Sequence, residues 1–213
     1  MADTKQKILD TAERLIATQG FAATSLRHII AEAGVNLASV HYHFGSKEEL
    51  LDHLIARKAS PVNEARMARL EAFEREAGGA PVPVEKVLTA FLEPMIEEGS
   101  RSPQFVQVMG RMQNEGMLPG LIAKHFQPTV AYFLRALRRS VPGLPDAELH
   151  WRIQFMFGAM SRAVSGTGGL PTHGIQADTP DFASVLRRLK TFCCAGLEAP
   201  ATQEVNTLEE VKQ

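Results

Sequence analysis

The chain has 213 residues, of which 45% are hydrophobic and 22% are charged, and its formal net charge is −1. This length corresponds to about one to one and a half average domains, so we expect one compact body. The composition is typical of a folded globular protein. No apolar run approaches the ~18 residues that a membrane span requires, so we expect no membrane partner. Because the net charge is near zero, a nucleic-acid partner can be inferred only from a local site.

The N-terminus and the cysteines indicate the compartment. Residues 3–7 are all polar, and the start of the chain lacks the apolar segment of a secretory signal. Cys193 and Cys194 are adjacent in sequence, and such close neighbours rarely pair, so a disulfide framework is excluded and a reducing compartment fits. We therefore expect a cytoplasmic protein whose cysteines act as small buried hydrophobes, with a redox-sensitive pair as the alternative.

The hydrophobic pattern predicts an all-α fold of about nine helices. Apolar residues recur at helical spacing through most of the chain, and glycine and proline clusters separate the periodic segments. The expected helices cover residues 4–19, 25–32, 36–44, 46–76, 84–98, 103–115, 121–139, 147–164 and 181–197. Pro119-Gly120 is expected to form a turn, Pro128 is a potential break in the seventh helix, and residues 165–180 are expected to form a long loop.

Residues 25–44 predict a helix-turn-helix, in which the second helix enters the major groove of DNA. Gly34 permits a left-handed turn between the two helices, and Ser46-Lys47-Glu48-Glu49 is a capping box that opens the next helix. The residues expected to bury the two helices are Leu26, Ile29, Ile30, Ala33, Val35, Val40 and Phe44. Those left on or near the outer side are Leu37, Ala38, Ser39, His41, Tyr42 and His43.

The charge around this motif is weak for a DNA-binding protein. Thr24, Ser25 and Arg27 stand at the start of a helix, where free N–H groups favour a phosphate, and Lys47 stands at the start of another. However, the first 57 residues carry six lysines or arginines against seven aspartates or glutamates. On these features alone, a plain helical hairpin without a role in DNA binding is the alternative to a DNA-binding helix-turn-helix.

Residues 4–57 resemble the DNA-binding segment of the TetR family of bacterial transcriptional regulators, above all from Gly34 to Leu50. Gly20-Phe21, Thr24-Ser25 and Ile29 match that family's spacing too. The resemblance implies a homodimeric repressor with a helix-turn-helix head and a larger all-helical, ligand-sensing body. We accordingly expect a DNA-binding domain over residues 1–50, a ligand-binding and dimerisation domain over 51–198 and a polar tail over 199–213.

The resemblance also implies roles for single residues of the head, with double-stranded DNA carrying a palindromic operator as the partner. Contacts to the DNA backbone are implied for Thr24, Ser25 and Arg27, contacts to base edges for Leu37, Ala38, Ser39 and His41, and contacts to phosphates for Tyr42, His43 and Lys47. Many family members have lysine or glutamine at position 37 and tyrosine at 41. Leu37 and His41 depart from this pattern, so base readout here can be apolar, for instance toward thymine methyl groups.

Bulky, soft side chains over residues 84–164 suit a pocket for a small apolar effector. The candidates for ligand contact are Phe91, Met95, Phe105, Met109, Met112, Phe126, Phe133, Trp151 and Phe155. For any one of them, plain core packing is the alternative. A weaker similarity of residues 149–159 and 165–166 to the PsrA-like, fatty-acid-responsive branch implies a long-chain acyl ligand as one option, with Arg111, His125 or Arg162 as the partner of its carboxylate.

The family resemblance further implies that helices 147–164 and 181–197 form a four-helix interface with a second copy of the chain. The candidate interface residues are Phe155, Ala159, Ala163, Val185, Leu189, Phe192 and Cys193. We expect no metal, no cofactor and no enzyme activity, because catalytic motifs are missing and His41 and His43, two residues apart on a helix, diverge. Two rivals remain: a helical ligand-binding or interaction module without specific DNA binding, and a helical-bundle enzyme that uses His125 or the cysteines.

Overall fold

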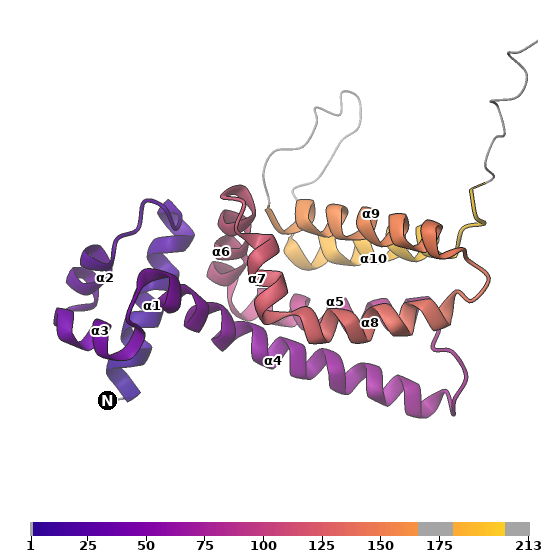
Figure 1. The fold of residues 1–213 in the computed structure, drawn as a ribbon, viewed down its shortest axis with the longest axis horizontal. Helices are drawn as coiled ribbons and strands as arrows, with labels where there is room; N and C mark the ends of the chain where they lie inside the picture. Colours follow the sequence, from indigo (N-terminus) through magenta and orange to yellow (C-terminus); the bar gives the residue numbers. More distant parts are fainter. Residues whose placement is uncertain (1, 166–180, 203–213) are drawn as a thin grey trace, which may run out of the picture.

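The computed structural model describes residues 2–165 and 181–202, and these residues form ten helices and no strand. The first four helices are α1 (Ala2–Gln19), α2 (Leu26–Ala33), α3 (Leu37–Phe44) and α4 (Lys47–Glu76). The others are α5 (Val84–Arg101), α6 (Pro103–Asn114), α7 (Leu118–His125), α8 (Gln127–Ser140), α9 (Asp146–Ser165) and α10 (Phe182–Glu198). Figure 1 shows a small head of α1–α3 at one end, with α4 running from it along the body. None of the described helices is long and apolar enough to cross a membrane.

The predicted all-α fold is confirmed, with one helix more than expected. The segment predicted as a single helix forms α7 and α8, which meet at Phe126. The predicted turn at Pro119-Gly120 is wrong, because both residues lie in the first turn of α7. Proline is tolerated there, where its missing N–H is not needed. Pro128 likewise stands at the start of α8 instead of breaking a helix. Of the loop expected over residues 165–180, residues 166–180 lie outside the described part.

The head forms as its sequence predicts. Gly34 adopts the left-handed conformation, with φ 61° and ψ 40°, and so ends α2 and permits the sharp entry into α3. Ser46 and Glu49 form the predicted reciprocal capping box at the start of α4. Ile29 and Val40 are fully buried and join α2 and α3 to the apolar face of α1. The outer side of α3 is thereby fixed relative to α1 and α4.

Two apolar cores lie along α4. The first core joins α1–α3 to the N-terminal half of α4 and to α6, and the second joins α5, α8, α9 and α10 to its C-terminal half. Pro61 lies inside α4 between Ala59 of the first core and Leu70 of the second. Because proline has no N–H, the carbonyl of Arg57 lacks its usual helical donor at this point. A weakened turn therefore separates the head part of α4 from the body part.

Candidate DNA-binding and ligand-binding sites

The outer face of the head presents an exposed aromatic group. The side chain of Tyr42 on α3 is 79% exposed, and its ring lies 5.1 Å from that of the half-buried His43, in an edge-on arrangement. At the start of α2, Ser25 accepts a hydrogen bond from the backbone N–H of His28 (3.1 Å), and Arg27 is exposed. For four further candidates the structure gives only their position on α3: Leu37, Ala38, Ser39 and His41.

Two side chains predicted to contact DNA form hydrogen bonds within the head. The hydroxyl of Thr24 is buried and donates to the carbonyl of Gly20 (2.7 Å), so the interpretation of this side chain as a backbone contact needs correction. The ammonium of Lys47 donates to the carbonyls of Phe21 and Thr24, both at 2.9 Å, and lies 4.1 Å from the centre of the Phe21 ring. An ammonium has three N–H donors, so one donor of Lys47 remains for a phosphate.

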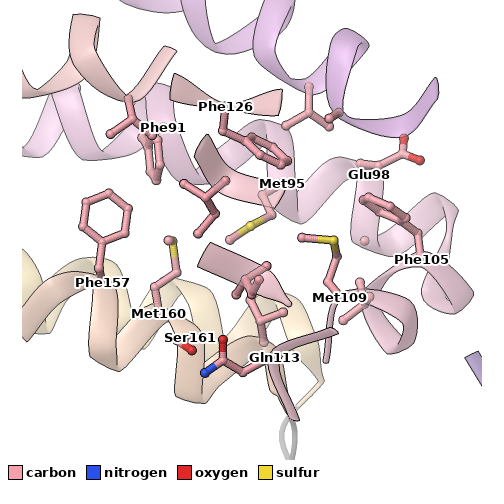
Figure 2. Close-up of a pocket in the computed structure, with 18 of the residues that line it drawn as sticks. Phe91, Met95, Glu98, Phe105, Met109, Gln113, Phe126, Phe157, Met160 and Ser161 are labelled. Carbon is pink, nitrogen blue, oxygen red and sulfur yellow. The ribbon is translucent and has the colours of Figure 1, made fainter. Parts of the chain in front are cut away.

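A cavity of about 330 Å³ lies inside the body, among α4–α10. Five of the predicted ligand-contact residues line it: Phe91, Met95, Phe105, Met109 and Phe126. Figure 2 shows the side chains of three methionines, Met95, Met109 and Met160, directed into the same space. Rings and thioethers dominate the wall, and such a wall accommodates flexible apolar groups.

Four other predicted contacts do not line the cavity. Met112 is buried in the first core, and Phe133 is buried in the second, where its ring centre lies 5.0 Å from that of Phe91. Trp151 and Phe155 of α9 are 59% and 65% exposed. The residues that α9 turns toward the cavity are instead Phe157, Met160, Ser161 and Val164. Their spacing of three, one and three residues marks one helical face, and it is the signal that could have identified them from sequence.

The buried polar group of the cavity is Arg66 of α4, which was not among the residues predicted from the sequence. Its side chain is almost fully buried, its Nε donates to the carbonyl of Phe91 (2.8 Å), and its guanidinium lies 4.1 Å from the centre of the Phe91 ring. Burial lowers the pKa of Arg66 to about 9. Ala59, Val62, Arg66 and Leu70 follow the helical spacing of a buried face, and this spacing is the signal that could have identified Arg66.

The three polar side chains predicted to meet a ligand carboxylate lie elsewhere. Arg111 donates to the carbonyl of Thr18 (2.9 Å) at the end of α1, the imidazole of His125 bonds to Asp52 (3.0 Å), and Arg162 is exposed. None of them lines the cavity. All three lie close in sequence to residues of the cavity wall, but the direction of each side chain is set by its helical face.

The helix α6 links the cavity to the head. Its N-terminal and middle part lines the cavity with Phe105 and Met109. Arg111 holds the end of α1, and Glu115, which follows the helix, accepts hydrogen bonds from the backbone N–H groups of Phe21 (2.9 Å) and Ala22 (3.1 Å). One short helix therefore contacts both the cavity and the turn between α1 and α2.

A second link joins α4 to α7. The carboxylate of Asp52 is bonded by Lys124 and by His125 at the end of α7. Burial raises the pKa of Asp52, but the hydrogen bonds from Lys124 and His125 and their charges outweigh this, so the net effect is a pKa below the usual value of 3.8. The amide of Asn63 also donates to the carbonyl of His125 (2.9 Å), which strengthens the same junction.

The outer side of α9 and α10 carries large exposed aromatic rings. Phe192 is 68% exposed, and the rings of Trp151 and Phe155 lie 6.0 Å apart on α9. Of the other predicted interface residues, Ala159, Ala163 and Val185 are half-buried. Leu189 and Cys193 are buried in the second core instead, so they are not available to a partner. Burial, with a smaller contribution from Cys194, raises the pKa of the Cys193 thiol to about 11. In the described part of the chain, metal-ligating side chains do not cluster.

Comparison with known proteins identifies the family. Residues 8–54 match the model of "bacterial regulatory proteins, tetR family", and residues 86–196 match that of the "tetracyclin repressor-like, C-terminal domain". The chain is 31% identical to the HTH-type transcriptional regulator AcrR of Shigella flexneri over 100 residues, which are 46% of this chain and 45% of that protein. It thus spans less than half the length of that curated relative.

Solved structures share the fold at low sequence identity. A putative TetR-family regulator from Syntrophomonas wolfei superimposes with a TM-score of 0.64 at 13% identity, over 96% of this chain and 99% of that one. The fatty acid degradation regulator FadR from Bacillus halodurans does so with a TM-score of 0.58 at 16% identity, over 92% and 97%. The head, the helical body and both family models agree: the chain belongs to the TetR family of bacterial regulatory proteins, with a helix-turn-helix head and a tetracyclin repressor-like C-terminal domain.

Proposed function

We propose that the protein is a homodimeric repressor that leaves a palindromic operator when a small apolar ligand enters the cavity. The position of α6 carries the proposal, because this helix lines the cavity with Met109 and is tied to the head through Arg111 and Glu115. A ligand that favours one position of α6 therefore favours one position of the head. It shifts the equilibrium by its difference in affinity for the two states.

The outer face of the head supplies the proposed DNA contacts. Ser25 and Arg27 would meet the DNA backbone at the start of α2, and Tyr42, His43 and the remaining donor of Lys47 would meet phosphates. The proposed base contacts come from α3, through Leu37, Ala38, Ser39 and His41. Such a regulator acts where the bacterial chromosome lies, in the cytoplasm.

The proposed dimer places two heads on one side of the DNA. Two copies of α3 must lie about 34 Å apart to reach successive major grooves, and a twofold pair of chains achieves this on a palindromic site. The exposed rings of Trp151, Phe155 and Phe192 support an interface on α9 and α10, because large exposed apolar side chains on neighbouring helices are typical of an interaction site.

The proposal is tested by measuring binding to the DNA upstream of the protein's own gene, by fluorescence anisotropy at several salt concentrations. We expect affinity to fall steeply as salt rises, because phosphate contacts release counterions. Tyr42→Ala should weaken binding to every DNA sequence similarly, whereas Ser39→Ala should change the sequence preference. Binding that is insensitive to salt would contradict phosphate anchoring.

A helical ligand-binding module without specific DNA binding is the second candidate. It is favoured by the near-neutral charge of the head and by the internal hydrogen bonds of Thr24 and Lys47. DNA affinity at low salt separates the two candidates. A module of this kind would bind operator and unrelated DNA equally weakly, while a repressor would discriminate between them by at least ~10³-fold.

A further inference from the structure

The cavity contains a buried positive charge without a carboxylate beside it. The guanidinium of Arg66 lies near the rings of Phe91 and Phe126, at 4.1 Å and 6.0 Å from their centres. Its polar contacts are the Phe91 carbonyl, the Asn63 amide oxygen and the Met95 thioether, all uncharged groups. No carboxylate of the described residues forms an ion pair with it, and only burial shifts its pKa.

The acidic residue in the cavity wall does not balance this charge. Glu98 lines the same cavity, but its carboxylate pairs with Lys58 (3.3 Å) and Arg101 (3.9 Å). In Figure 2, Glu98 lies near Phe105, at the opposite end of the lining from Phe91. The cavity around Arg66 therefore has a net positive charge at neutral pH, and an unpaired buried charge of this kind destabilises the free protein.

The weakly engaged donors of Arg66 are those that a carboxylate needs. Its Nε is used by the Phe91 carbonyl at 2.8 Å, whereas the two terminal nitrogens have only long contacts, of 3.4 Å to Asn63 and 3.8 Å to Met95. The terminal nitrogens of an arginine lie in one plane and fit both oxygens of a carboxylate. Lysine would supply only a point charge at the same place, so the residue type itself favours a planar anion.

We propose that the cavity binds an amphiphile with one free carboxylate, which pairs with Arg66 while its apolar part lies among the methionines and phenylalanines of the wall. This inference rests on the proposed function and specifies its ligand class. The volume of about 330 Å³ lies near the lower end of the ~300–1,000 Å³ range of ligand pockets, which indicates a medium-length chain or a compact ring system. An acyl thioester or ester is excluded as the preferred ligand, because its carboxylate is no longer free.

The inference is tested by isothermal titration calorimetry with ligands that share a tail and differ in the head group: decanoate, 1-decanol and decyltrimethylammonium. Hexanoate and tetradecanoate extend the series in length. We expect at least one carboxylate to bind the wild-type protein about 10-fold or more tightly than the matching alcohol, because hydrogen bonds between charged groups are about twice as strong as neutral ones. The ammonium compound should bind most weakly.

Two substitutions and one control separate a ligand contact from a structural role. Arg66→Met keeps an unbranched, flexible side chain, shortens it and removes the charge, and should lower carboxylate affinity about 10- to 100-fold while leaving 1-decanol affinity unchanged or tighter. Arg66→Lys should give an intermediate loss. Arg69→Met is the matched control, because Arg69 lies one turn further along α4, pairs with Glu97 (2.6 Å) and does not line the cavity.

Several outcomes would overturn the inference. These are failure of all three carboxylates to bind the wild-type protein, equal affinity for carboxylate and alcohol, or an equal loss of both in Arg66→Met. If Arg66→Met does not fold, the inference is still tested by the order of ligand affinities for the wild-type protein and by the affinities of Arg66→Lys. Release of operator DNA by 1-decanol but not by any carboxylate would refute this inference alone, whereas carboxylate binding without any operator binding would refute only the proposed repressor.

Discussion

The aromatic face of α9 and α10 provides the sharpest test of the proposed dimer. A phenylalanine side chain buries about 200 Å², so the 65% of Phe155 and 68% of Phe192 that are exposed leave roughly 130 Å² each for a partner. At ~25 cal/mol per Å², covering one ring contributes about 3 kcal/mol. A twofold dimer buries both rings of both chains, which gives roughly 12 kcal/mol of apolar burial.

Replacing both rings by serine should therefore break the dimer. Association also costs free energy, so only part of the burial free energy contributes to affinity. Losing a quarter of it, about 3 kcal/mol, already raises the dissociation constant of the dimer more than ~100-fold. Analytical ultracentrifugation of Phe155→Ser/Phe192→Ser measures the change directly. Trp151 is the only tryptophan and lies 6.0 Å from Phe155, so its emission should shift to longer wavelength when the wild-type dimer dissociates on dilution.

The matched control for this test is Tyr42→Ser, which removes a ring from the head that is 79% exposed, more than either phenylalanine. It should leave the association state unchanged and weaken DNA binding, whereas the double variant should lose both dimer and operator binding. A double variant that remains dimeric at micromolar concentration would refute the reasoning. So would a Tyr42→Ser protein that becomes monomeric, because the interface would then involve the head.

Three further predictions concern the links between head and body. Glu115→Gln removes the charge that accepts from two backbone N–H groups, so urea unfolding should show a loss of about 1 kcal/mol while calorimetry shows unchanged ligand affinity. The pKa of Asp52 is lowered in the folded protein, so the ionised carboxylate stabilises the fold fully above pH 3.8, and this stabilisation is lost as the pH falls below that value. Asp52→Asn should therefore flatten this part of a curve of unfolding free energy against pH. An unchanged curve would refute the stabilising role of the Asp52 carboxylate. Pro61→Ala restores the missing helical donor in α4, so thermal unfolding should show a gain of about 1–3 kcal/mol, and a loss would mean that the proline fits its site without strain.

The head could be predicted in detail because its determinants are local. The left-handed Gly34, the capping box of Ser46 and Glu49, and the alternation of buried and exposed positions on α2 all act within one or two helical turns. The functions of Thr24 and Lys47 were less predictable from the same residues. Their hydrogen-bond partners lie in the turn between α1 and α2, and only the tertiary structure brings Lys47 to the carbonyl of Phe21.

The body was predicted less well because residue type alone does not give the direction of a side chain. Aromatic rings on α9 were expected in the cavity, but Trp151 and Phe155 lie on the outer face, and Phe157 lies on the inner one. A shift of two positions along a helix is about half a turn, so the composition of a segment does not distinguish the two faces. Arg66 was not predicted as a cavity residue because its residue type was misleading: arginine is rarely buried and is expected at the surface.

The two faces of α6 explain how one small ligand could control a large DNA contact. The residues that line the cavity and those that hold the head alternate along the helix, so Met109 cannot move far without moving Arg111 and the following Glu115. Interiors are close-packed, so under the proposed mechanism a ligand that needs more room than the existing cavity displaces the helix instead of compressing it. Linkage then requires that operator DNA weakens ligand binding by the same factor by which the ligand weakens DNA binding. Because Glu115 lines neither the cavity nor the outer face of α3, its replacement should reduce this factor without changing the affinity for either partner alone, a pattern that direct damage to one of the two sites would not produce.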